Sequence, residues 1–101
     1  MLKCCFYFLD KPEIKDGVRK KITSWINHET KMTCEAEGFP APDITWTRND
    51  VTIFPLKSQT GVRELRITPK DVNDFGDFVC TAKNLLGSTR QIVTIEEIGK
   101  V

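Results

Sequence analysis

The 101-residue sequence predicts an all-β fold in which two antiparallel sheets pack face to face as a Greek-key sandwich. Short segments with apolar residues at every second position recur along the chain, and this is the period of a strand with one buried face. Two such segments carry Cys34 and Cys80, and a third segment between them carries Trp46. Cysteine, tryptophan and cysteine on three short strands are typical of such a sandwich.

The segment from Arg63 to Ala82 has the clearest pattern. Apolar side chains alternate with charged ones around Leu65, and the alternation returns from Phe78 onward. Residues 68–74, between the two runs, include a proline that cannot donate to a sheet and side chains that bond their own backbone. We therefore expect a chain reversal between two strands, with Leu65 and Phe78 in the core.

The strand of Cys80 predicts a partner cysteine on a strand of similar pattern. Residues 31–37 are the only good candidate, because their apolar positions, Cys34 among them, fall on one face. Cys4 and Cys5 precede the first plausible strand, and the sequence assigns them no role. If the two cysteines are oxidised, a disulfide between Cys34 and Cys80 closes a loop of about 46 residues and stabilises the fold by about 4 kcal/mol.

The other strands are predicted from local patterns, in order along the chain. A segment containing Pro12 is restricted to an edge, because proline lacks an N–H for the sheet. Asp16-Gly17 is a turn signal before the next alternating segment, and Gly87 falls within a hairpin. The expected strands are 11–15, 18–25, 31–37, 44–47, 51–54, 63–67, the strand of Cys80 continuing to residue 84, and 89–95, with a hairpin at 85–88.

Two runs carry a resemblance to a known family. Residues 74–80, Asp-Phe-Gly-Asp-Phe-Val-Cys, resemble the Asp-x-Gly-x-Tyr-x-Cys pattern of immunoglobulin folds. Residues 38–46 resemble the Gly-x-Pro-x-Pro-x-Ile-x-Trp run of I-set domains, and with 82–87 the resemblance covers about residues 11 to 98. It implies an immunoglobulin-like I-set sandwich in which Trp46 packs on a disulfide between the sheets.

A narrower resemblance and one departure accompany this pattern. Residues 73–76 and 80–82, with Trp25 before the first cysteine strand, are similar to the membrane-proximal immunoglobulin domain of the neural cell adhesion molecule family. The family usually has tyrosine two residues before the second cysteine, where this chain has Phe78. A hydrogen bond of about 0.5–1.5 kcal/mol is therefore absent, and we expect the fold to survive its loss.

Length and composition predict one domain. We expect residues 1–10 to be a disordered or non-native extension, 11–98 the immunoglobulin-like domain, and 99–101 a linker. Because residues 4–9 form too short an apolar run for a signal peptide, we interpret the chain as a fragment of a longer protein or an imperfect gene model.

The charge balance and residue inventory exclude several functions. A net charge of +1 gives no field for nucleic acid or an anionic membrane, and no segment is long enough for direct membrane insertion. A single histidine and the lack of a Cys-x-x-Cys spacing argue against a metal site, and no catalytic arrangement or phosphate loop occurs. We expect no enzymatic activity and no cofactor. Residues 19–21, all basic, are interpreted as a solvated edge, with a patch for heparin or an acidic partner as the alternative.

Two surfaces are candidate contact sites for a protein. The loop that begins at Phe39 and the hairpin of Leu85 and Leu86 should meet at one end of the sandwich, where they would form an apolar tip. We expect this tip to pack on a neighbouring domain or a partner, with inward-facing caps of the core as the alternative. The second candidate is the outer face of the sheet that carries Trp46 and Cys80, to which Val79 should contribute. Thr45, Thr47 and Thr81 should project from the same face.

The resemblance implies a module for protein–protein recognition. It implies one domain of a cell-adhesion or receptor-like ectodomain on the extracellular side of the plasma membrane, beside neighbouring domains, with a homophilic or heterophilic protein partner. The alternative is a structural module of an intracellular muscle or cytoskeletal protein, where the two cysteines are often reduced. A third possibility is a small secreted binder. The sequence leaves open the redox state of Cys34 and Cys80 and the identity of the partner.

Overall fold

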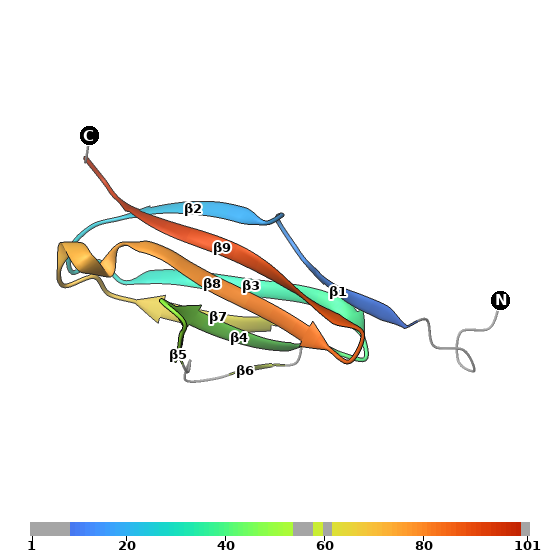
Figure 1. The fold of residues 1–101 in the computed structure, drawn as a ribbon. Coiled ribbons are helices and arrows are strands. Elements are labelled where there is room, and N and C mark those ends of the chain that lie inside the picture. The colour runs from blue at the N-terminus through green and yellow to red at the C-terminus, as the bar shows by residue number, and fades with distance from the viewer. Residues whose placement is uncertain (1–8, 54–57, 60–61, 100–101) are drawn as a thin grey trace.

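The computed structural model describes residues 9–53, 58–59 and 62–99, which form two packed β-sheets (Figure 1). Cys4, Cys5 and most of the predicted N-terminal extension lie outside the described residues. The elements are β1 Asp10–Ile14, β2 Arg19–Ser24, β3 Thr30–Phe39, β4 Asp43–Arg48, β5 Val51–Ile53, β6 Ser58–Gln59, β7 Val62–Ile67, the 3-10 helix η1 Val72–Asp74, β8 Gly76–Asn84 and β9 Gly87–Glu97.

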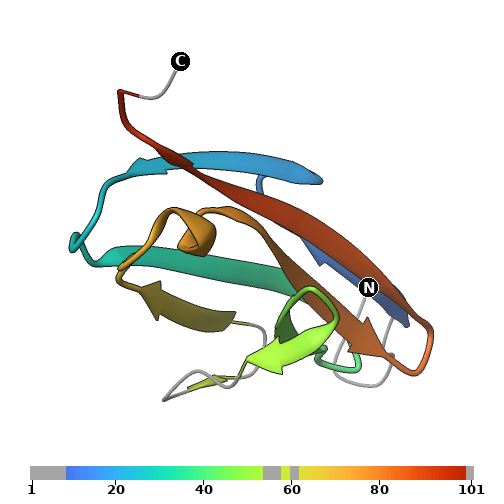
Figure 2. The ribbon, with the colours of Figure 1, turned by 60° about the vertical axis from the view of Figure 1, so that its left-hand side comes forward.

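The two sheets have the strand orders β1-β3-β7-β6 and β2-β9-β8-β4-β5. Neighbouring strands are antiparallel, as predicted, except that β2 runs parallel to β9, with Arg19 opposite Ile92 and Ser24 opposite Glu97. Figure 2 shows β2, in blue, beside β9, in red. The parallel pair arises because the chain leaves the four-stranded sheet after β1 and continues alongside β9 in the five-stranded sheet.

The last hairpin is tighter than predicted. Its strands pair up to Asn84 opposite Gly87, so that Leu85 and Leu86 alone form the turn. The predicted four-residue loop was wrong because the Oδ1 atom of Asn84 accepts a hydrogen bond from the Leu86 N–H and closes the turn early. Strand β9 is correspondingly longer than the predicted 89–95. The predicted last residue of the 51–54 strand lies outside the described residues.

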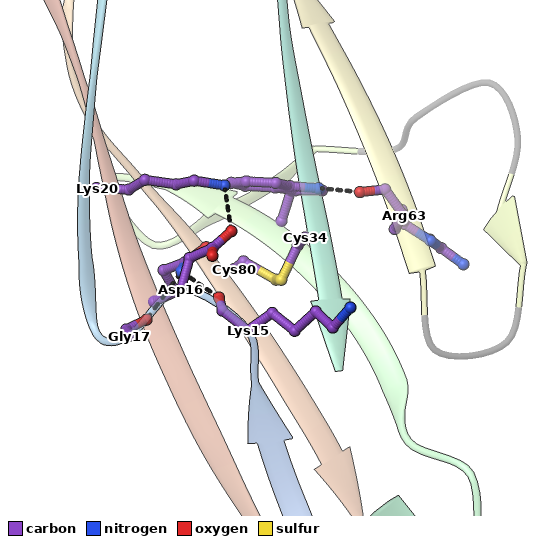
Figure 3. The surroundings of a disulfide bond; sticks show 9 residues. Lys15, Asp16, Gly17, Lys20, Cys34, Arg63 and Cys80 are labelled. Carbon is purple, nitrogen blue, oxygen red and sulfur yellow. Dashed lines mark hydrogen bonds and ion pairs between the residues drawn. A yellow bond between two sulfur atoms is a disulfide. The ribbon is translucent and has the colours of Figure 1, made fainter. Parts of the chain in front are cut away.

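A disulfide between Cys34 and Cys80 joins β3 to β8 at the centre of the core (Figure 3). Trp46 is the cross-strand partner of Cys80, and its Nε1 donates to the Arg63 carbonyl of the opposite sheet at 3.3 Å. Trp46, Phe78 and Leu65 are all buried. The two sheets are therefore held together by a covalent bond and, beside it, by an indole hydrogen bond.

A buried amide holds the crossover from β1 to β2. Gln91 lies on β9 opposite Cys80 and has no significant exposed surface. Its Nε2 donates to the carbonyls of Lys15 and Gly17, at 2.9 and 2.8 Å. A buried amide is costly unless it is hydrogen-bonded, and these two bonds satisfy both of its donors. Gln91 thus fixes the point at which the chain changes sheets.

The corner between β7 and β8 is fastened by Arg48 at the end of β4. Its guanidinium donates to the carbonyls of Asn73, Asp74 and Phe75 at 2.6–2.8 Å. The same group lies 4.5 Å from the centroid of the buried Phe78 ring. Arg48 therefore contacts the corner at the position where the sequence lacks the usual tyrosine hydroxyl.

The Asp74 carboxylate stabilises the corner from within. It accepts hydrogen bonds from the backbone N–H groups of Lys70 and Asp71, at 2.8 and 3.1 Å. Asp71 in turn accepts from the N–H of Asn73 at 3.2 Å, which completes a capping box around η1. The Asp74 carboxylate thus bonds backbone N–H groups of the corner, while Arg48 bonds its carbonyls.

Replacing Gln91 by methionine tests the crossover. Gln91→Met keeps a side chain of similar length but removes both donors, and we expect the free energy of unfolding to fall by about 1–3 kcal/mol. Urea unfolding followed by tryptophan fluorescence measures the change. Thr89→Val, on the same strand, is the control and should change stability by less than about 0.5 kcal/mol. Equal stability of Gln91→Met and the unsubstituted protein would contradict the proposed role.

Replacing Arg48 tests the corner. Arg48→Met removes three hydrogen bonds and the contact of the cation with the Phe78 ring, and should cost about 2–3 kcal/mol of stability. Arg48→Lys keeps the charge but not the planar fork of donors, so its stability should lie between those of the other two proteins. Thermal unfolding measures the series. A lysine variant as unstable as the methionine variant would mean that the charge contributes nothing.

Candidate protein-contact site

The side chain of Asn84 joins three segments at the end of the sandwich where β1 begins. Its Nδ2 donates to the carbonyls of Asp10, at 2.8 Å, and Pro40, at 3.0 Å, while its Oδ1 accepts from the Leu86 N–H. The start of β1, the loop after β3 and the β8–β9 turn are therefore held as one unit. Figure 1 shows these three segments together at one end.

Apolar side chains are exposed on this unit. Leu85 is 78% exposed, Phe39 is 41% exposed and Leu9 is 61% exposed, whereas Leu86 is half-buried. We call the surface formed by Leu9, Phe39, Leu85 and Leu86 the Leu85 end. The sequence predicted that Phe39 begins a loop, but it is the last residue of β3 and pairs with Asp10. The structure thus brings Phe39, Leu85 and Leu86 to one end of the sandwich. The alternative, in which these side chains turn inward and cap the core, fits only Leu86.

The opposite end of the sandwich also carries exposed apolar side chains. Trp25 follows β2, is 47% exposed, and stacks on His28 with ring centroids 3.7 Å apart. Ile98 follows β9 and is 58% exposed, and its N–H donates to the Ser24 carbonyl at 2.8 Å. We call Trp25 and Ile98 the Trp25 end. Exposed apolar side chains therefore lie both where β1 begins and where β9 finishes.

The outer face of the five-stranded sheet is the second candidate. Thr45, Thr47, Val79 and Thr81 alternate with buried residues of β4 and β8, and all four are half-buried. Val79 faces Ile92 on the neighbouring strand β9. On β4 and β8 this face therefore has the short side chains expected from the sequence.

Several charges on the outer face of the four-stranded sheet form pairs. A hydrogen bond from Arg66, 2.8 Å long, holds the pKa of the Glu64 carboxyl below its ordinary value. A hydrogen bond to Glu35, together with its charge, raises the pKa of Lys15. These groups are exposed to solvent, and such pairs contribute little stability. Charges that are already paired on this sheet are also less available to bind a partner protein.

The described residues provide no metal centre and no membrane-spanning helix. Within residues 9–53, 58–59 and 62–99, no three histidine, cysteine or acidic side chains form a group that could hold a metal ion. No helix in this part of the chain is both long and apolar enough to cross a bilayer.

Two residues that shape the candidate surfaces were missed in the sequence. Asn84 precedes a turn, and asparagine at such a place often bonds the backbone two residues on, so its bond to Leu86 had a local signal. Its bonds to Asp10 and Pro40 had none, because they join segments far apart in the chain. Ile92 was missed because an apolar residue on the outward face of a strand, next to a buried one such as Val93, carries no local signal of a contact role.

Comparison with known proteins agrees with this geometry. A family model described as an immunoglobulin domain matches residues 11–84. The human leucine-rich repeat, immunoglobulin-like domain and transmembrane domain-containing protein 3 is 35% identical over 96 residues, which are 88% of this chain and 14% of that protein. The rat limbic system-associated membrane protein is 30% identical over 95 residues, 89% of this chain and 28% of that protein.

A solved structure supports the same assignment. Titin domain M7 superposes with a TM-score of 0.75 at 27% identity, covering 90% of this chain and 97% of that one. The chain spans less than a third of the length of the two curated relatives named above. The Cys34–Cys80 disulfide, the neighbouring Trp46 and the two-sheet order are the features expected of such a domain. The chain belongs to the immunoglobulin domain family.

Proposed function

We propose that this chain is a non-enzymatic protein-recognition domain from the extracellular part of a cell-adhesion or receptor-like protein. The observation that carries the proposal is the Leu85 end, where apolar side chains are exposed on a unit held together by Asn84. Relatives whose names include a transmembrane domain or a membrane protein support the membrane context. Both are several times longer than this chain, which supports neighbouring domains beside it.

The Leu85 end suits a protein partner. Covering apolar surface stabilises a complex by about 25 cal/mol per Å², and Leu85 offers most of its side chain for such contact. The hydrogen bonds of Asn84 order the three segments before any partner binds, so that binding loses less conformational entropy. The partner is either a second copy of this domain or a different protein. The Trp25 end contacts a neighbouring domain of the same protein.

A structural role inside muscle or the cytoskeleton is the second candidate, favoured by the similarity to titin domain M7. The disulfide argues against it, because disulfides persist in oxidising compartments and are rare in the cytosol. The two functions therefore differ in the expected state of Cys34 and Cys80 in cells.

The contact role is tested by attachment of coated beads to cells. Beads that carry the folded domain should cluster with one another or bind the surface of cells from the source tissue. Leu85→Asp should lower attachment at least about 5-fold, because burying an unpaired carboxylate in an apolar contact costs more than 1 kcal/mol.

The matched control is Val51→Asp, which changes another exposed apolar residue, on β5. It should leave attachment unchanged. Circular dichroism should show both variants folded. An equal loss in the two variants, or no attachment by the unsubstituted domain to beads or cells, would reject the contact role of the Leu85 end.

The compartment is tested by the state of the cysteines. Protein isolated from its native source is alkylated at once, digested without reductant and analysed by mass spectrometry. We expect a pair of peptides linked through Cys34 and Cys80, and their separation after reduction. Alkylated Cys34 and Cys80 in the unreduced sample would instead support the cytoskeletal function.

A further inference from the structure

The outer face of the five-stranded sheet contains a hollow of about 320 Å³ that the recognition role does not yet use. Its lining combines aliphatic side chains with two arginines. The lining residues are Val18, Arg19, Val79, Arg90 and Ile92. They come from β2, the turn before it, β8 and β9.

Strand pairing positions these side chains. Ile92 lies at the centre, with Val79 opposite it on the antiparallel β8 and Arg19 opposite it on the parallel β2. The N–H of Ile92 donates to the Val18 carbonyl at 2.9 Å, which holds the beginning of β2 against β9. Arg90 lies two residues before Ile92, on the same face of β9. Ile92 and Val79 thus form an aliphatic floor of the hollow, with Arg19 beside it on β2 and Arg90 two residues away along β9.

Neither arginine has a carboxylate partner within the described part of the chain. Arg19 and Arg90 take part in none of its ion pairs or side-chain hydrogen bonds, although both are exposed. Two acids on this face, Asp77 and Glu96, are engaged by other groups. Asp77 accepts a hydrogen bond from the Thr94 hydroxyl at 2.5 Å, and Glu96 lies 3.6 Å from Lys21. The hollow therefore keeps two unpaired cations beside exposed aliphatic carbon.

We propose that this hollow binds an extended segment of a partner protein in which carboxylates flank an aliphatic side chain at alternate positions. The aliphatic group covers Ile92 and Val79, and the carboxylates bind the Arg19 and Arg90 guanidinium groups. Arginine binds carboxylates through two parallel hydrogen bonds, and alternate residues of an extended segment lie about 6.5–7 Å apart on one face. The same spacing separates Ile92 from Arg90 along β9.

A protein segment fits this hollow better than a sulfated glycan does. A glycan would gain nothing from the aliphatic floor, and the nearby Lys20 and Lys21 are already paired with Asp16 and Glu96. This inference deepens the proposed recognition role by giving the chemistry of a second contact. It does not depend on the Leu85 end, so failure of one test leaves the other standing.

Peptide titration of the ¹⁵N-labelled domain, followed by amide chemical shifts, tests the proposal. The probe is acetyl-Glu-Ser-Leu-Ser-Glu-amide at low salt, which should shift the amides of Val79, Arg90 and Ile92. Two matched peptides separate the contributions: one with Gln in place of both Glu, and one with Ser in place of Leu. Each should bind at least about 5-fold more weakly, because it lacks either the charge pairing or the apolar contact.

The variants Arg19→Gln and Arg90→Gln should each weaken binding of the probe at least about 3-fold, with unchanged spectra elsewhere. Arg66→Gln, which removes the same charge from the other sheet, is the control and should bind as the unsubstituted domain does. The proposal is overturned by no shift at these amides, by equal binding of the Gln peptide, or by an equal loss in Arg66→Gln. A heparin tetrasaccharide that shifts these amides while the peptide does not would replace it with a glycan site.

Discussion

The disulfide between Cys34 and Cys80 is the constraint on which the rest of the structure depends. It joins β3 of one sheet to β8 of the other, and both cysteines are completely buried. Trp46 beside Cys80 reaches across to the backbone of Arg63 in the opposite sheet. Because strands alternate their side chains, fixing which residues face this layer also fixes those that face solvent. The packing of the core therefore determines which side chains lie on the outer surfaces of the two sheets.

The buried polar group Gln91 has an effect that reaches the surface. By holding the carbonyls of Lys15 and Gly17, it sets where the chain passes from one sheet to the other. That position brings β2 alongside β9 in parallel and places Arg19 opposite Ile92. The chemistry of the hollow on the outer face thus depends on a hydrogen-bonded amide in the core.

Much of the fold was predictable because its signals are local. Alternation of apolar residues identified the strands around Cys34, Trp46 and Cys80, and Asp16-Gly17 marked a turn where the structure has one. Gln91 could have been found too, since it has the same parity on β9 as the buried apolar residues Val93 and Ile95.

The remaining features depend on contacts between distant segments. Nothing local distinguishes a parallel β2 from an antiparallel one, because both show the same alternation. Arg48 lies about 25 residues from the carbonyls that it binds, and a contact between residues so far apart cannot be predicted from local sequence spacing. The I-set subtype, the resemblance to the neural cell adhesion molecule family and the contact roles of Phe39, Leu85, Leu86 and Val79 stay predictions.

The position of Asn84 has a consequence for how this surface can diverge. One amide sets the relative placement of three segments that carry exposed side chains. A replacement at that single site would rearrange all three while leaving every outward-facing residue unchanged. Selectivity for a ligand can therefore be retuned from a position that never touches it, which separates the residues that determine shape from those that determine chemistry.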